Sequence, residues 1–278
     1  EVRDCTCIDV DTSVLEGDQL KILSSIGDQQ SAAVGQACFE PGDIKSTYGT
    51  GGFLMLNTGN LLVRSSNRLV STIGLQVGGT RTYALEGSIF VAGAVVQWLR
   101  DGMGLIKHAS ETSVRAQKSG DDELYMVPAF TGLGAPWWVP EARGAVYGIT
   151  RDTGPNDFIK AALDSVAYQT CDLFDALARD GVTPNAVRVD GGMAANDWFL
   201  QRLSDLLDLT VERPSVTETT AVGVAMLAAL ADGVFSDLRE IGKNWQLEAK
   251  FQSTMSLEVR RQLKSGWGKA IERTKLRL

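Results

Sequence analysis

The residue types that could do chemistry gather at three places where an apolar run meets a turn. At the first, Asp28 follows the run 21–27 and has Gln29 beside it. A carboxylate in this place is often the N-cap of a helix, but a carboxylate held by backbone amides also serves as a base toward a substrate hydroxyl. Both interpretations of Asp28 stay open, because one side chain can fill both roles. Gln29 would add a neutral hydrogen-bonding group.

The second place is the run Tyr48-Gly49-Thr50-Gly51-Gly52, which opens an apolar strand. Glycine weakens strand pairing and packs nothing, so its presence here favours one of two explanations. One is a tight hairpin that needs positive φ, and the other is a backbone that must come close to a bulky anion. In the second case, the amide N–H groups and the Thr50 hydroxyl would face a phosphate.

The third place is the segment 189–196, where a strand, the pair Gly191-Gly192 and a helix follow one another. The free N–H groups and partial positive charge of a helix N-terminus suit an anion. Asn196, one turn into the expected helix, could reach a base or a ribose. The segment lacks the G-x-G-x-x-G spacing of a dinucleotide-binding turn, and the chain lacks a Walker A loop.

Composition limits the class of protein. The chain has 278 residues, of which 44% are hydrophobic, and a net charge of −7 without a basic block. Binding to nucleic acid or to an anionic membrane is therefore disfavoured. No apolar run reaches the roughly 20 residues of a membrane span, and no secretory leader opens the chain, so we expect a cytoplasmic location.

The cysteines and the single histidine offer no metal-binding pattern. Cys5-Thr6-Cys7 is an isolated pair, and His108 has no Cys or His near it in the sequence. We therefore expect reduced cysteines, no metal held by side chains and no histidine catalysis. The remaining cysteines are Cys38 and Cys171.

Apolar periodicity predicts a mixed α/β domain over residues 21–250, after an irregular lead over 1–20 and before a helical extension over 251–278. The first strand is expected within 21–27. Further strands are expected at 44–50, 51–59, 71–77, 80–87, 123–130, 144–150, 186–190 and 211–214. Helices are expected at 28–39, 88–101, 110–118, 155–177, 193–207 and 217–233. The extension should dock through Leu257, Leu263, Trp267 and Ile271.

Five segments, in order, resemble the glycerol kinases among the FGGY carbohydrate kinases of the actin-like ATPase superfamily. They are IGDQQSAAVGQ, STYGTGGFLMLNTG, YALEGSIFVAGAVVQWLRD, VPAFTGLGAPWWVPEARGAVYGIT and RVDGGMAANDWFLQ. The resemblance implies a ribonuclease-H-like α/β domain with a mixed sheet of about five strands flanked by helices. It also implies transfer of the γ-phosphate of ATP to glycerol, giving glycerol 3-phosphate, with ATP and Mg²⁺ as cofactors.

The resemblance further implies a role for individual residues. Asp28 matches the catalytic base, and Gln29 and Phe53 match glycerol contacts. On the residues alone, Gly93 would be interpreted as helix packing and Gln97 as facing solvent. The residues that match nucleotide contacts are Thr50, Gly51, Gly93, Gln97, Gly192 and Asn196.

Nothing in the chain matches the N-terminal half of these kinases, which carries further glycerol contacts. The sequence is thus interpreted as the ATP-binding C-terminal domain of a longer protein, with the N-terminal kinase domain as a partner. Dimers and tetramers occur in the family. Two alternatives stay open: an FGGY kinase for another polyol or sugar, and a catalytically silent actin-like module that binds nucleotide.

Overall fold

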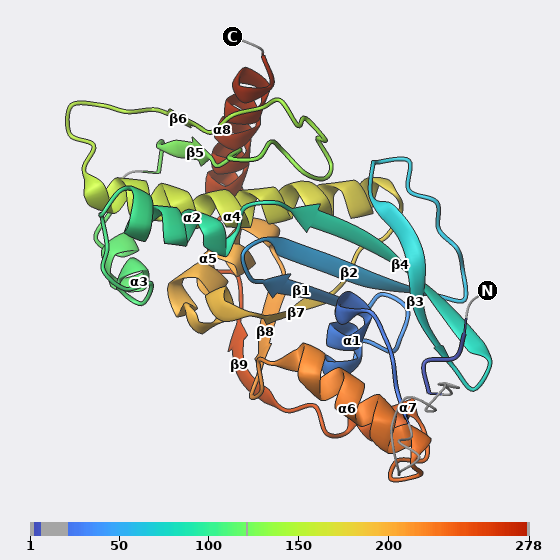
Figure 1. Cartoon of the computed structure of the whole chain (residues 1–278). Helices are drawn as coiled ribbons and strands as arrows, with labels where there is room; N and C mark the ends of the chain where they lie inside the picture. The colour runs from blue at the N-terminus through green and yellow to red at the C-terminus, as the bar shows by residue number, and fades with distance from the viewer. Residues whose placement is uncertain (1–2, 7–21, 121, 277–278) are drawn as a thin grey trace, which may run out of the picture.

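The computed structural model describes residues 3–6, 22–120 and 122–276, so most of the expected lead over 1–20 lies outside the described residues. Its centre is a seven-stranded sheet with the strand order β3-β4-β2-β1-β7-β8-β9. Helices α4 and α5 cover one face of this sheet, and α1 and α6 cover the other (Figure 1). The predicted mixed α/β layer structure is confirmed. Its main sheet has seven strands, whereas the resemblance implied about five.

The order of the strands brings two of the predicted turns together. β1 pairs antiparallel with β2 and parallel with β7, and Thr47 on β1 lies opposite Asp190 on β7. Because β1 and β7 run in the same direction, the turns that follow them leave the sheet at one edge. The strands of the large sheet are β1 (Ile44–Tyr48), β2 (Gly52–Gly59), β3 (Val70–Val77), β4 (Thr80–Ile89), β7 (Ala186–Asp190), β8 (Thr210–Pro214) and β9 (Leu247–Phe251). A separate hairpin consists of β5 (Tyr125–Val127) and β6 (Ala145–Tyr147).

The helices follow the predicted pattern at most positions. The longest helix, α4, begins at Pro155. Proline is tolerated at the first helical position because an N–H group there would have no partner within the helix. The helices are α1 (Asp28–Gly35), α2 (Gly93–Gln97), α3 (Glu111–Ala116), α4 (Pro155–Arg179), α5 (Asp197–Leu207), α6 (Thr219–Ala231), α7 (Leu238–Gly242) and α8 (Leu257–Lys275). Two short turns have other helical geometry: the π-helical η1 (Trp98–Gly102) and the 3-10 helix η2 (Gly192–Ala195).

The small residues of α1 allow it to touch α6 almost backbone to backbone. A Cβ placed on Gly223 of α6 would lie 1.9 Å from the carbonyl oxygen of Ser31. The same atom on Gly35 would lie 2.0 Å from the carbonyl oxygen of Thr219. Neither glycine can carry a side chain unless the helices separate, so the small-residue pattern reflects this contact.

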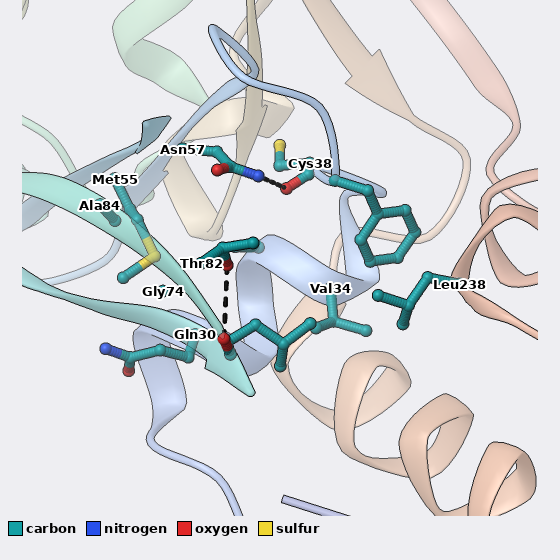
Figure 2. Close-up of a pocket in the computed structure, with 12 residues that line it drawn as sticks. Gln30, Val34, Cys38, Met55, Asn57, Gly74, Thr82, Ala84 and Leu238 are labelled. Carbon is teal, nitrogen blue, oxygen red and sulfur yellow. Dashed lines mark hydrogen bonds between the residues drawn. The ribbon is translucent and has the colours of Figure 1, made fainter. Parts of the chain in front are cut away.

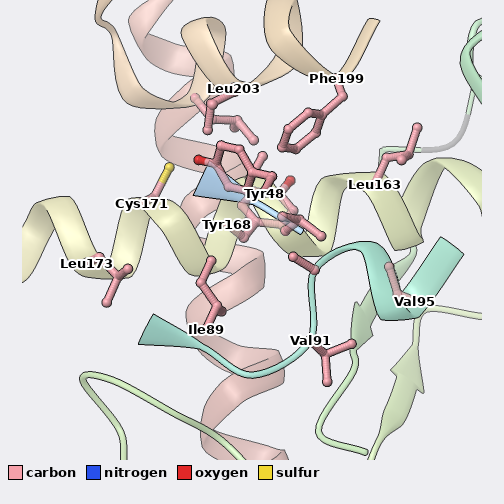
Figure 3. Packing of buried hydrophobic residues seen from close by; sticks show 14 of the residues in the cluster. Tyr48, Ile89, Val91, Val95, Leu163, Tyr168, Cys171, Leu173, Phe199 and Leu203 are labelled. Carbon is pink, nitrogen blue, oxygen red and sulfur yellow. The ribbon is translucent and has the colours of Figure 1, made fainter. Parts of the chain in front are cut away.

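The core on the α4 face is centred on Tyr48, the last residue of β1 (Figure 3). Its ring meets Phe199 of α5 edge to face at 5.2 Å. Its hydroxyl lies 3.0 Å from the Thr170 Oγ1 of α4. These contacts fix the end of β1 against two helices, and the glycine-rich turn starts at this point.

Some expectations about the elements are wrong, among them the helix over 88–101, because residues 88–89 belong to β4 and α2 begins only at Gly93. Residues 22–27 form no strand, and Asp28 is the first residue of α1. β9 was not expected, although its alternation of apolar and charged residues is a strand pattern. Helix α8 docks through Leu263, Trp267 and Ile271 as predicted, but Leu257 is 53% exposed. In the described part of the chain, no helix combines the length and hydrophobicity that crossing a bilayer requires.

Candidate functional site

A cavity of about 520 Å³ opens at the edge of the sheet where β1 and β7 end. Its walls come from the β1–β2 turn, from α2 and α3, and from the segment between β7 and α5. The residues with predicted nucleotide contacts that line it are Thr50, Gly93, Gln97, Gly192 and Asn196. Gly51 lies buried in the same turn as Thr50 but does not line the cavity.

Gly191 brings the two turns into contact. It adopts a φ of +84°, which favours glycine, and a Cβ there would lie 2.6 Å from the carbonyl oxygen of Tyr48. The β7 turn thus passes directly over the end of β1. The turns at Thr50 and Gly192 therefore line one cavity, whereas Asp28 does not line it.

Gly93 packs against the backbone of Gly49 and also lines the cavity. Its N–H donates to the carbonyl oxygen of Gly49 at 2.8 Å, and the N–H of Ala92 donates to that of Thr50 at 2.9 Å. The start of α2 thereby holds the carbonyl groups of the glycine-rich turn. Gln97 lies one turn further along α2 on the same helix face, exposed toward the cavity.

Gly192 stands in a different environment. A Cβ placed on it would meet no atom within 4 Å. Since Gly192 lines the cavity, a side chain there would enter the open volume rather than the packed interior.

Asn196 connects two walls of the cavity, and its place differs from the prediction. The turn η2 separates it from Gly191, and it is the N-cap of α5 rather than a residue one turn into the helix. Its Oδ1 accepts a hydrogen bond from the Phe199 N–H at 3.0 Å. Its Nδ2 donates to the Oγ1 of Thr112 on α3 at 3.1 Å. Asn196 thus has a structural role as well as a place in the cavity lining.

A second, smaller pocket of about 50 Å³ holds two of the predicted substrate residues. Gln29, at the start of α1, and Phe53, 41% exposed on β2, both line it. Glu86 and Trp138 complete the polar and aromatic parts of its wall. Burial raises the pKa of the Glu86 carboxyl, which accepts a hydrogen bond from Gln30 Nε2 at 3.3 Å.

Asp28 lies beside this smaller pocket without lining it. The residue is exposed, and its Oδ1 accepts the N–H of Gln29 at 2.8 Å. The N-cap of α1 is Gly27, so Asp28 is not the cap that propensity suggested. The structure thus brings Gln29 together with Phe53, and Thr50 together with Gly192, and leaves Asp28 at the rim.

Sequence reasoning missed several residues of these walls. Arg100, Ser110 and Ser113 line the large cavity, and Arg100 is paired with Asp101 at 2.7 Å. No motif marks them, because they come together only when η1 and α3 fold over the turn. Lys45 was also missed, although a charged residue inside the otherwise apolar and small strand IKSTY was a readable signal.

A further cavity, of about 40 Å³, lies between α1 and strands β2, β3 and β4 (Figure 2). Its lining is mostly apolar and includes Val34, Met55 and Leu238, with the buried Cys38 at one side. A void of this size has room for about one or two water molecules. None of the predicted site residues lines it.

The sequence predicted that no side chains of this chain hold a metal ion. Within the described ranges, no group of three or more His, Cys, Asp or Glu residues could hold a metal ion. Cys38 and Cys171 are free and buried, and burial raises the pKa of both thiols to about 12. Cys7 lies outside the described residues.

Comparison with known proteins identifies the family. Residues 44–231 match the model of the FGGY family of carbohydrate kinases, C-terminal domain. The chain is 52% identical over 277 residues to glycerol kinase 1 of Pseudomonas aeruginosa, an alignment that covers 99% of this chain and 56% of that protein.

Solved structures agree with the sequence relatives. The crystal structure of Plasmodium falciparum glycerol kinase with ADP aligns with a TM-score of 0.86 and 39% identity, over 92% of this chain and 52% of that one. A ligand-bound xylulose kinase from Lactobacillus acidophilus aligns with a TM-score of 0.76 and 19% identity, over 87% and 49%, which shows a shared fold. The chain spans about half the length of these relatives. It belongs to the FGGY family of carbohydrate kinases, of which it contains the C-terminal domain.

Proposed function

We propose that this chain is the nucleotide-binding domain of a glycerol kinase, which transfers the γ-phosphate of ATP to glycerol. The observation that carries the proposal is the cavity of about 520 Å³, which joins the two glycine turns predicted to bind the nucleotide. The residues predicted to contact the nucleotide come from separate segments, and all of them except Gly51 line this one space. A chance resemblance in the sequence would not bring them together.

The cavity suits a nucleotide in its chemistry. The Thr50 hydroxyl lies at the glycine-rich turn, and Met193, Val96 and Leu163 give the cavity apolar wall. A pocket with a mostly apolar wall and few polar groups is typical of a small-molecule site. The relative from Plasmodium falciparum was solved with ADP, which supports the assignment. Mg²⁺ would arrive with the nucleotide phosphates and neutralise their charge, which this acidic chain does not offset.

The smaller pocket, of about 50 Å³, would supply one wall of a polyol site, and the other half of the kinase would supply the rest. Phe53 offers an apolar ring to the C–H groups of glycerol, and Gln29 offers an amide to a hydroxyl. Asp28 would accept the proton of the attacking hydroxyl while the new O–P bond forms and the bond from the γ-phosphorus to the β-γ bridging oxygen breaks, which releases ADP. Phosphoryl transfer of this kind depends mainly on positioning and charge, so this half would contribute the nucleotide cavity, the wall of the smaller pocket and the Asp28 carboxylate.

The other half of the cleft would come from the N-terminal kinase domain. The relatives are about twice as long as the aligned region, since 56% of the Pseudomonas aeruginosa protein is covered. We therefore assign glycerol turnover to the complete protein and nucleotide binding to this chain.

Two measurements test the proposal. Titration calorimetry of this chain with ATP and Mg²⁺ should show saturable binding. The complete protein should convert glycerol and ATP to glycerol 3-phosphate and ADP. A chain that binds no nucleotide would exclude the proposal, and turnover of xylulose or gluconate but not glycerol would change the substrate.

A further inference from the structure

Lys45 is a lysine with no exposed surface in the middle of the large sheet. It takes part in none of the ion pairs found among residues 22–120 and 122–276. Its Nζ instead donates to three neutral oxygens. These are Gln29 Oε1, Thr47 Oγ1 at 3.0 Å and the carbonyl oxygen of Phe53 at 3.2 Å. All three N–H groups of the ammonium are therefore used.

Burying an ammonium group is costly unless its hydrogen bonds are satisfied. The cost is visible in Lys45, because burial lowers the pKa of its ammonium to about 8 against the opposing attraction of nearby acidic groups. An apolar side chain in this strand would avoid that cost. The location of its acceptors suggests what Lys45 provides, because Gln29 and Phe53 both line the smaller pocket.

The contact with Lys45 determines which end of the Gln29 side-chain amide faces the pocket. A glutamine side chain has one acceptor end and one donor end. Since Lys45 has only donors, it fixes the Oε1 of Gln29 toward the interior. The Nε2 of Gln29 is then the end left for a ligand. Next to it, the Asp28 carboxylate is an acceptor, bonded to the Gln29 N–H at 2.8 Å.

We propose that Lys45 is a positioning residue for the polyol pocket, holding Gln29 so that its amide donates to a substrate hydroxyl oxygen. One hydroxyl group could then accept from Gln29 and donate to Asp28. This pair of complementary groups selects a hydroxyl over a carbonyl, which could accept but not donate. The inference rests on the proposed function for the identity of the substrate, and on the contacts of Lys45 for the orientation.

A double-mutant cycle in the full-length protein tests the inference. The variants are Lys45→Met, Gln29→Leu and their combination, each measured for the KM of glycerol and the KM of ATP. Lys45→Met should raise the glycerol KM by about tenfold and leave the ATP KM within about twofold. The combined variant should be no worse than Gln29→Leu, because Lys45 acts through Gln29. Additive effects, or a parallel rise in both KM values, would overturn the inference.

Lys160→Met is the matched control. Lys160 is also a buried lysine, but it pairs with Asp164 at 3.0 Å and Asp122 at 2.7 Å, and it lines neither pocket. Its loss should lower the melting temperature and leave both KM values unchanged. A rise in the glycerol KM of this control as large as that of Lys45→Met would show that any buried charge matters equally, which contradicts the inference.

A second measurement does not depend on folding of the methionine variant. In full-length protein labelled with 15N-glutamine, the side-chain amide resonances of Gln29 should shift with a midpoint near pH 8, as Lys45 loses its proton. Resonances that stay constant between pH 7 and pH 11, a range that includes both the lowered and the ordinary pKa of lysine, would overturn the orientation. Absence of glycerol turnover in the wild-type protein would instead reject the proposed function, and the amide titration would still decide the orientation. The other titratable groups that face Lys45 are those of Asp190, Glu86, Asp28 and Cys38.

Discussion

Gly93 and Gly49 approach so closely that a Cβ on Gly93 would lie 2.5 Å from the carbonyl oxygen of Gly49. The neighbour in this contact is backbone, which cannot move aside as a flexible side chain can. Gly93→Ala should therefore lower the free energy of unfolding by about 1–3 kcal/mol and displace the glycine-rich turn. Urea denaturation of the chain measures this effect.

The control for this substitution is Gly268→Ala. Gly268 lies within α8, where a Cβ would meet nothing within 4 Å. Alanine is the better helix former, so this change should be neutral or stabilising by up to about 1 kcal/mol. An equal loss of stability in both variants would show that the contact with Gly49 has no special weight.

Gly192→Leu separates nucleotide binding from stability. The position has open space around its Cβ and lines the large cavity. A leucine should be accommodated with a change of less than about 1 kcal/mol in stability, while its side chain occupies nucleotide volume. Calorimetry should show at least a tenfold weaker affinity for ATP. Unchanged affinity with an intact fold would place the nucleotide elsewhere.

Asn196 caps α5 and also lines the large cavity, and two substitutions can separate these roles. Asn196→Ala removes the N-cap of α5 and the bond to Thr112, so it should lower the free energy of unfolding by about 1 kcal/mol and weaken ATP binding. Asn196→Asp keeps a good capping side chain but adds a negative charge to the cavity. Because aspartate keeps the cap but loses the donor to Thr112, this variant should lose less stability than Asn196→Ala and still weaken ATP binding. If the aspartate variant binds ATP normally, Asn196 is only a cap.

Asp28→Asn tests the base in the complete protein. The change is nearly isosteric, and Asp28 does not line the large cavity, so ATP affinity should stay within about twofold. The turnover number should fall by about a hundredfold or more, because the amide cannot accept the hydroxyl proton. Near-normal turnover would rule out Asp28 as the base.

The buried carboxyl of Asp172 should make the free energy of unfolding depend on pH. Its Oδ2 accepts from Trp137 Nε1 at 3.0 Å and from Trp267 Nε1 at 2.9 Å. Burial raises the pKa of the Asp172 carboxyl from 3.8 to about 7, and the two indole bonds only partly oppose this rise. Between these pH values the folded state keeps a proton that the unfolded state releases. The free energy of unfolding should therefore fall as the pH increases through this range.

Asp172→Asn should remove that slope. The amide resembles the protonated acid and can still accept from both indoles. Urea denaturation at pH 5 and pH 8 should show the variant gaining on the wild type at the higher pH, by on the order of 2 kcal/mol. A constant difference between the two proteins at both pH values would contradict the raised pKa.

The sequence predicted those parts of the fold that have a local signal. Apolar alternation and glycine pairs located β1, β2 and β7, and the proline at residue 155 located the start of α4. The parallel pairing of β1 with β7 joins residues far apart in the chain, and no local pattern encodes it. The expected strand within 21–27 failed because an apolar run alone does not supply a neighbouring strand.

Some residues of the candidate site were predicted from the sequence and others were missed. The residues of the large cavity came mostly from the resemblance, since Gly93 and Gln97 have ordinary structural interpretations on their own. Arg100 depends on a tertiary contact that only folding creates, whereas the charge of Lys45 inside an apolar strand was a signal in the sequence that went unused. Asn196 was assigned to the right region, but its capping role went unrecognised because the 3-10 turn before it shifts the start of the helix.

The strand β9 has a consequence for how the protein is made. β8 obtains its antiparallel neighbour only from residues Leu247–Phe251, after α6 and α7 have been added. While the ribosome is still translating the domain, the outer edge of β8 has unpaired N–H and C=O groups that another nascent chain can bind. Synthesis of this domain should consequently depend on chaperones until its last strand has emerged from the exit tunnel.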